Sequence, residues 1–199
     1  MADAPALPRL AMAVPRVREV IGAGFRLHPE PELGVIKVQL YRGEGQQKLA
    51  AALGAAPPTA GTQIGLARGV DCASIAPGEW LLLGPRNALC DLAALIERDL
   101  QGALALVTDL SDGRVGFSLS GPAARDRLAS VCPLDLRAKS FPPGAAARSL
   151  LGDTGLFLAR LPDGDNGPVF RLVVDQTAAA YAARMIALPG AARNSEVEP

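Results

Sequence analysis

The chain has 199 residues, of which 49% are hydrophobic and 20% charged, so it holds enough apolar material for a packed core and is not a disordered segment. Its 20 basic residues balance its 20 acidic residues, and this neutral sum lacks the basic excess of a nucleic-acid-binding domain. The three cysteines, Cys72, Cys90 and Cys132, are widely spaced, which argues against a disulfide framework and favours free buried thiols in a reducing compartment.

The chain shows no sequence signal for secretion or for membrane insertion. Its longest early apolar run, Leu10 to Val14, is too short for a signal peptide and lies between Arg9 and Arg16. No stretch approaches the roughly 18 apolar residues that a spanning helix needs. We therefore expect a soluble, cytoplasmic protein.

The two ends differ in composition from the middle of the chain. Residues 1–33 are rich in alanine, proline and arginine, and their prolines exclude a long helix. We expect an extended arm that packs on the domain or on a partner. Residues 189–199 are small and polar and predict a frayed tail. Residues 34–188 are expected to form one α+β domain.

The first half of this domain, residues 34–102, begins with alternating polar and apolar residues over 34–41, which is typical of a half-buried strand. A short helix is expected at 46–53, because Leu49 and Leu53 share one face and Gly54 suits its end. A strand at 79–83 follows, and Gly84-Pro85 then opens a helix with the apolar stripe Leu89, Leu92, Ile96 and Leu100.

The second half, residues 103–188, repeats this plan. Strands are expected at 103–108, 115–119, 155–161 and 169–174. One helix should follow Ser120, a suitable N-cap residue, and a final helix should span about 177–188. The order strand, helix, strands, helix therefore occurs twice and predicts an internal duplication, in which each half forms a small sheet with helices on one face.

The single histidine, His28, has no partners in the sequence for catalysis or metal binding. No G-x-S-x-G motif accompanies it, and the cysteines are not at zinc-ligand spacing. Gly22-Ala-Gly24 and Gly43-Glu-Gly45, with Lys48 nearby, lack the spacing of a dinucleotide or phosphate loop. We interpret His28 as a surface or interface residue and the glycines as turn residues.

Two segments concentrate polar residues. In the first, Asp109 could act as a general base or bind a ligand amine, but Ser111-Asp112-Gly113 also fits a hairpin turn, in which Asp109 accepts backbone hydrogen bonds or pairs with Arg114. In the second, Cys132 lacks a nearby base that would activate it, and Asp135 suits a cap of the following turn. We favour structural roles in both segments and predict no catalytic, cofactor-binding or metal-binding residue.

A set of short runs, rather than one diagnostic motif, is informative through its order and spacing. These runs are Glu79-Trp-Leu-Leu-Leu-Gly-Pro85, Asp109-Leu-Ser-Asp-Gly-Arg-Val115, Leu119-Ser-Gly-Pro-Ala-Ala-Arg125, Leu128-Ala-Ser-Val-Cys-Pro-Leu-Asp-Leu136 and Phe141-Pro-Pro-Gly144. Together they resemble the gamma subunit of heterotetrameric sarcosine oxidase, and the resemblance covers about residues 34–188.

This resemblance implies a fold like that of the aminomethyltransferase, or glycine-cleavage T-protein, folate-binding group. It implies partnership with alpha, beta and delta subunits in a complex that oxidises sarcosine to glycine, peroxide and a folate-bound one-carbon unit. The FAD, FMN, NAD, tetrahydrofolate and zinc of such a complex would be carried by the other subunits. Two alternatives stay open: a subunit of a related complex such as N-methylglutamate dehydrogenase, and a free-standing folate-binding or aminomethyltransferase-like protein.

Overall fold

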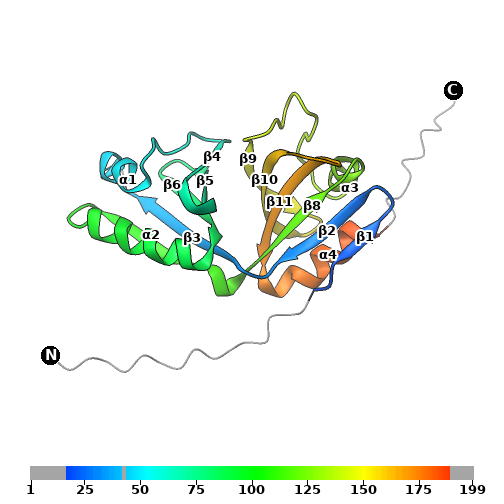
Figure 1. The fold of residues 1–199 in the computed structure, drawn as a ribbon, viewed down its shortest axis with the longest axis horizontal. Helices are drawn as coiled ribbons and strands as arrows, with labels where there is room; N and C mark the ends of the chain where they lie inside the picture. The colour runs from blue at the N-terminus through cyan, green and yellow to red at the C-terminus, as the bar shows by residue number, and fades with distance from the viewer. Residues whose placement is uncertain (1–16, 42–43, 189–199) are drawn as a thin grey trace, which may run out of the picture.

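A computed structural model describes residues 17–41 and 44–188 of the chain, which form two antiparallel sheets with helices on their outer faces (Figure 1). The first sheet has the strand order β4-β5-β6-β3-β7, and the second has the order β1-β2-β8-β11-β10-β9. In chain order the strands are β1 (Val20–Gly22), β2 (Phe25–Glu30), β3 (Leu33–Leu40), β4 (Gln63–Gly65), β5 (Asp71–Ala76), β6 (Glu79–Pro85), β7 (Ala105–Asp109), β8 (Arg114–Ser120), β9 (Ala146–Leu151), β10 (Thr154–Gly164) and β11 (Gly167–Asp175). The helices are α1 (Gln46–Leu53), α2 (Arg86–Asp99), α3 (Ala124–Ala129) and α4 (Ala179–Ala187), with short 3-10 turns η1 (Ala67–Gly69), η2 (Ser111–Gly113) and η3 (Gln176–Ala178).

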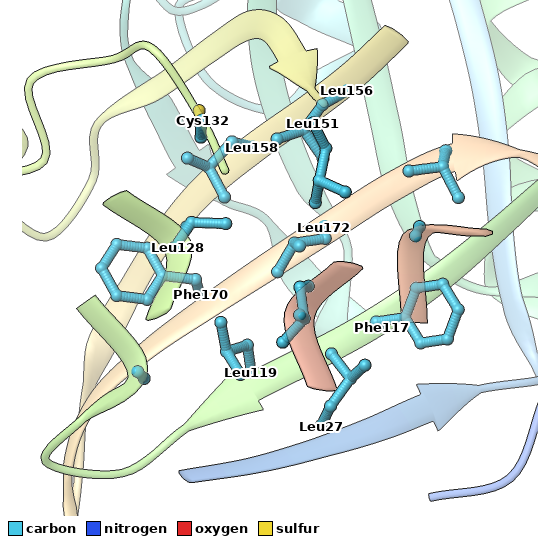
Figure 2. Close-up of a cluster of buried hydrophobic side chains, with 14 of the residues drawn as sticks. Leu27, Phe117, Leu119, Leu128, Cys132, Leu151, Leu156, Leu158, Phe170 and Leu172 are labelled. Atoms are coloured by element: carbon cyan, nitrogen blue, oxygen red, sulfur yellow. The ribbon is translucent and has the colours of Figure 1, made fainter. Parts of the chain in front are cut away.

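Three apolar clusters hold the layers together, because side chains alternate between the two faces of each strand. On the outer face of the first sheet, Val38, Trp80 and Leu82 pack with buried residues of α1 and α2. A second cluster fills the space between α3, α4 and the outer face of the second sheet, where Phe117 and Phe170 are buried (Figure 2). The third cluster lies between the sheets and contains Leu33, Val35, Ala73, Leu81, Leu83, Ala146, Phe157, Ala159 and Val173.

The duplication is present, and the two repeats exchange their first strands. Strand β2 lies in the second sheet, and the chain then crosses to β3 in the first sheet. Likewise β7 lies in the first sheet, and the chain crosses to β8 in the second. Each repeat is therefore one strand in the opposite sheet followed by strand, helix, three strands and helix. The expected α+β class, with two related halves, is confirmed.

This exchange corrects the expected limits of the two halves. Strand β7 belongs to the first sheet through its pairing with β3, although the sequence placed it in residues 103–188. Residues 25–30 pair with β8, so the part of the predicted arm that the structure describes is a β-hairpin within the second sheet. Pro29 is compatible with this strand because, within the described residues, β1 pairs with β2 only from Phe25 to Leu27, so Pro29 lies beyond the part of β2 that is paired on both sides.

The arm and tail predictions otherwise concern residues outside the described part of the chain, namely 1–16 and 189–199. Among the helices, the expected positions hold for α1, which ends at Gly54 with a φ of 68°, and for α2, which begins directly after Pro85. Within the described residues, no helix has the length and apolar character needed to cross a membrane.

The sequence suggested that Ser120 caps the next helix, but it does not. Helix α3 begins later, at Ala124, and its N-cap residue is Ala123. The reason is the backbone of Gly121, which turns at a φ of 115° and lies so close to Gly24 that a Cβ atom would be 2.5 Å from that carbonyl oxygen. The glycine is therefore required by the approach of two backbones, and the helix starts only after this turn.

Candidate functional site

The segment that follows β7 is a crossover between sheets and not the hairpin that Ser111-Asp112-Gly113 suggested. Strands β7 and β8 do not pair with each other. The backbone amide of Ser111 donates to Asp109 Oδ1 over 2.9 Å, and the buried Ser111 Oγ accepts from the amide of Val35 over 2.9 Å. Asp109 thus accepts a backbone hydrogen bond, as one structural interpretation expected, and this bond fixes the start of the crossover.

The two charged residues that follow bind partners far away in the sequence. Arg86 Nη1 donates to Asp112 Oδ1 over 2.7 Å, which ties the start of α2 to the crossover. Arg114 Nη1 donates to Asp175 Oδ2 over 2.8 Å, at the end of β11. Of the two alternatives for Asp109, the pairing with Arg114 is therefore not the one observed, because Arg114 pairs with Asp175, a residue that sequence proximity could not indicate.

His28 lies on β2 with its side chain about half exposed. Its Nδ1 is 2.9 Å from Glu19 Oε1, and Arg26 donates to the same oxygen. The hydrogen bond from Arg26, followed by that from His28, lowers the pKa of Glu19 below its ordinary value. His28 therefore belongs to a hydrogen-bonded group at the surface in which Glu19 is the acceptor, which agrees with its interpretation as a surface residue.

The cysteines do not converge on one another or on His28. Cys72 is fully buried, and its burial raises the pKa of the thiol to about 12, so it is uncharged at neutral pH. Cys132 is buried with its Sγ 3.6 Å from Ser149 Oγ, whereas Cys90 is exposed on α2. In the described part of the chain, no group of three or more His, Cys, Asp or Glu residues is placed to hold a metal ion.

The remaining candidate residues take part in local structure. Asp135 accepts from the amide of Arg137 over 3.1 Å and from Ser140 Oγ over 2.6 Å, as a turn cap should. Hydrogen bonds from Arg137 and then Ser140 hold the pKa of Asp135 well below its usual range. Lys48 Nζ donates to the backbone oxygen of Gln101 over 2.9 Å and so joins α1 to the end of α2.

A cavity of about 240 Å³ lies between the two sheets and was not foreseen from the sequence. Its apolar wall includes Leu81 and Phe157, and three cationic residues also line it: Lys37 from β3, Arg114 from β8 and Arg148 from β9. The only sequence signal for this site was the alternation in β3, which placed Lys37 on the same side as Val35. The contributions of β8 and β9 depend on how the sheets pack.

A second polar feature joins the sheets elsewhere. Arg171 on β11 donates from Nε to Glu30 Oε2 over 3.0 Å and from Nη1 to Asp71 Oδ2 over 2.6 Å. Glu30 comes from the same sheet, and Asp71 comes from the other sheet. The side chain of Arg171 is only 15% exposed, so this ion triad lies largely inside the sheet interface.

Glu79, near the cavity, gives a prediction for acid stability. Lys37 Nζ lies 2.8 Å from Glu79 Oε2, and Gln39 Nε2 donates to Oε1 over 2.9 Å. The hydrogen bond from Lys37, with further contributions from Gln39 and the charge of Arg148, lowers the pKa of Glu79 from its ordinary 4.5. The unfolded chain therefore takes up this proton at higher pH than the folded chain, so the stabilisation is complete above about pH 4.5 and is lost as pH falls through the folded pKa.

We expect Glu79→Gln to lose less stability than the unsubstituted chain when both are acidified from about pH 6 to pH 3. Urea unfolding followed by circular dichroism at each pH measures this difference. Parallel pH profiles for the two proteins would show that the carboxylate makes no net contribution.

Comparison with known proteins shows a sequence similarity over part of the chain. No family model matches the chain. Over 117 residues the chain is 35% identical to the sarcosine oxidase gamma subunit of an Arthrobacter species, and this match covers 58% of the chain and 57% of that relative. The chain thus spans little more than half the length of this curated relative.

Two solved structures share the fold. The heterotetrameric sarcosine oxidase from Corynebacterium sp. U-96, in complex with pyrrole 2-carboxylate, contains a chain that is 25% identical, with a TM-score of 0.74 and coverage of 85% of both chains. The glycine cleavage system aminomethyltransferase T from Bartonella henselae is 20% identical, with a TM-score of 0.62, and the match covers 82% of this chain and 45% of that one. The chain is accordingly similar in sequence to sarcosine oxidase gamma subunits over little more than half its length, and its two-sheet fold is the one found in a chain of sarcosine oxidase and in the aminomethyltransferase.

Proposed function

We propose that the chain is a non-catalytic accessory subunit of a heterotetrameric sarcosine oxidase. It would assemble with alpha, beta and delta subunits, which would carry the FAD, FMN, NAD, tetrahydrofolate and zinc of the complex. The observation that carries this proposal is the match to a chain of heterotetrameric sarcosine oxidase over 85% of both chains. A match of that extent includes both repeats of the fold.

The contacts of the candidate residues support a structural role. Asp109, Asp135 and Asp175 each accept a backbone amide hydrogen bond close by in the chain. Groups engaged in this way stabilise turns. Lys48 and Arg114 are likewise bonded within the fold.

We propose that another subunit docks on the edge of the first sheet, where β3 ends and the edge strand β7 begins. Tyr41, Leu104 and Leu106 are 55%, 60% and 57% exposed, and they lie together where β3 and the edge strand β7 meet. The amide of Tyr41 donates to the oxygen of Leu104 over 2.9 Å, and Leu106 pairs with Gln39. Clustered apolar side chains of this kind are typical of interaction surfaces.

Co-expression with the alpha, beta and delta subunits tests both statements. The 199-residue chain should co-purify with them in one particle, and the chain alone should show no flavin absorbance and no sarcosine oxidation. Leu106→Glu should weaken its retention in the particle about tenfold or more, because burying a carboxylate against an apolar partner is unfavourable. Leu150→Glu is the matched control, since Leu150 is 49% exposed on β9, in the other sheet.

Failure of the chain to join any such particle would contradict the accessory role, whereas assembly that Leu106→Glu leaves intact would contradict only the docking surface. Activity of the assembled particle on N-methylglutamate rather than sarcosine would favour the related dehydrogenase. Calorimetry of the chain alone with tetrahydrofolate tests the folate-binding alternative, which requires clear binding that Asp109→Asn abolishes.

A further inference from the structure

The duplication creates two matching crevices between the sheets, and the side chains in them differ. The first crevice is the one that contains Arg171, and the second is the one that contains Leu81. In the second sheet Arg171 of β11 lies opposite Ser118 of β8. In the first sheet Leu81 of β6 lies opposite Lys37 of β3. β6 and β11 are the corresponding strands of the two repeats, and the last residue of each, Pro85 or Asp175, lies opposite the first residue of its partner strand. Leu81 and Arg171 each lie four residues before that end, so they occupy matching positions. The two crevices can therefore be compared residue by residue.

The first crevice is closed by the ion triad. Arg171 extends between the sheets and contacts both Glu30 and Asp71, so one cation meets two carboxylates. All three side chains are a quarter exposed or less. This crevice is filled by charged groups that neutralise one another.

The second crevice has apolar residues at the matching positions and is hollow. Asp71 is paired with Leu83 across β5 and β6, and Phe157 is paired with Val173 across β10 and β11. Leu83 and Val173 are matching residues of the two repeats, so Phe157 occupies the position that Asp71 has in the first crevice. Leu81 replaces Arg171 in the same way. The cavity of about 240 Å³ is bounded by both of these side chains. An apolar cavity of about 150 Å³ accommodates benzene, so this one has room for a ring with a substituent.

The charges around this cavity do not balance. Lys37 is paired with Glu79 over 2.8 Å, and Arg114 is paired with Asp175 over 2.8 Å. The side chain of the third cation, Arg148, forms no hydrogen bond or ion pair with any residue in the described part of the chain. It lines the cavity together with Lys37, and its charge contributes to the lowered pKa of Glu79. A guanidinium at the edge of a cavity with one apolar wall is suited to bind a carboxylate through two parallel hydrogen bonds.

We propose that this cavity binds a small organic carboxylate with a flat apolar body. The apolar body would lie against Leu81 and Phe157, and the carboxylate would pair with Arg148 at the rim. The proposal goes beyond the accessory role and does not depend on it, because all the residues belong to this chain.

Benzoate is the probe for the test, with benzyl alcohol as its uncharged counterpart. The full 199-residue chain should bind benzoate saturably in calorimetry, and the amide signals of Ser149 and Gly155, two residues at the cavity, should shift in nitrogen–proton correlation spectra. Benzyl alcohol should bind at least about tenfold more weakly, because it cannot form the charged pair.

Two variants and a control locate the binding. Arg148→Gln should raise the Kd for benzoate about tenfold or more. Gly155→Leu should block the cavity, because Gly155 lines it and a leucine side chain would occupy part of its volume. The backbone should tolerate the substitution, since no atom lies within 4 Å of the position of the added Cβ atom and the φ of Gly155 lies outside the left-handed region. Arg98→Gln, at an exposed arginine near the end of α2, should leave the affinity unchanged. The proposal fails if the unsubstituted chain shows no saturable binding at millimolar benzoate, or if either Arg148→Gln or Gly155→Leu retains its affinity.

Discussion

Arg171→Met should lower the free energy of unfolding by about 3 kcal/mol. Methionine keeps much of the apolar length of the arginine but removes the charge that faces Glu30 and Asp71. Those carboxylates are only 21% and 25% exposed, so they would remain close together, poorly hydrated and without a cation. Removing one member of a buried ion group is costly for this reason, even where the intact group stabilises little overall.

The triple variant Arg171→Met, Glu30→Gln, Asp71→Asn separates these effects. It should recover much of the lost stability, because the remaining groups no longer carry unpaired charge. Arg98→Met is the matched control: its partner Asp99 is the next residue and its side chain is 68% exposed, so we expect a change within about 0.5 kcal/mol. Urea unfolding of the four proteins supplies the comparison, and equal stability of Arg171→Met and the unsubstituted chain would show that the triad does not hold the sheets together.

Phe170→Ala should lower the free energy of unfolding by about 4 kcal/mol. The ring is fully buried between the second sheet and its helices (Figure 2), where its centroid lies 6.5 Å from that of Phe141. The guanidinium carbons of Arg125 and Arg160 also lie 5.5 and 5.1 Å from the centre of the ring. The alanine variant therefore leaves a cavity and takes away the aromatic face on which two cations rest.

Phe170→Leu distinguishes these two contributions. Leucine restores most of the packed volume but offers no aromatic face, so its loss of stability should lie between those of the alanine variant and the unsubstituted chain. Leu150→Ala, at a side chain that is 49% exposed, should change stability by about 0.5 kcal/mol or less. Thermal and urea unfolding provide the measurement, and a loss below about 1 kcal/mol for Phe170→Ala would mean that the core readily closes around the missing ring.

Local pattern in the sequence was sufficient for several elements of the fold. The alternation over residues 34–41 corresponds to β3, and Gly54 ends α1 where its backbone flexibility suggested. The structural interpretation of Asp109 as a backbone acceptor also holds, because the bond to Ser111 spans only two residues. These features depend on neighbours in the chain, so their physical cause is readable from short segments.

The sequence failed where one segment could satisfy two arrangements. Ser111-Asp112-Gly113 has the composition of a hairpin turn, yet it crosses from one sheet to the other, because β7 pairs with β3 and β8 pairs with β2 and β11. The prolines of residues 1–33 indicated an arm, yet Pro29 lies in strand β2, at a position that pairs with β8 alone among the described strands. Composition limits what a segment can do, but the available partner strands decide between the options.

By itself, then, the sequence determined the α+β class, the repeated order of elements and the resemblance to the gamma subunits. Only the tertiary structure decided which strands the repeats exchange, where the cavity lies and which charges meet. Arg171 reaches Glu30 and Asp71 across separations of 141 and 100 residues. Alternation fixes the face of a strand on which a side chain lies, but the neighbour across that face is set by the packing of two sheets, which no local pattern encodes.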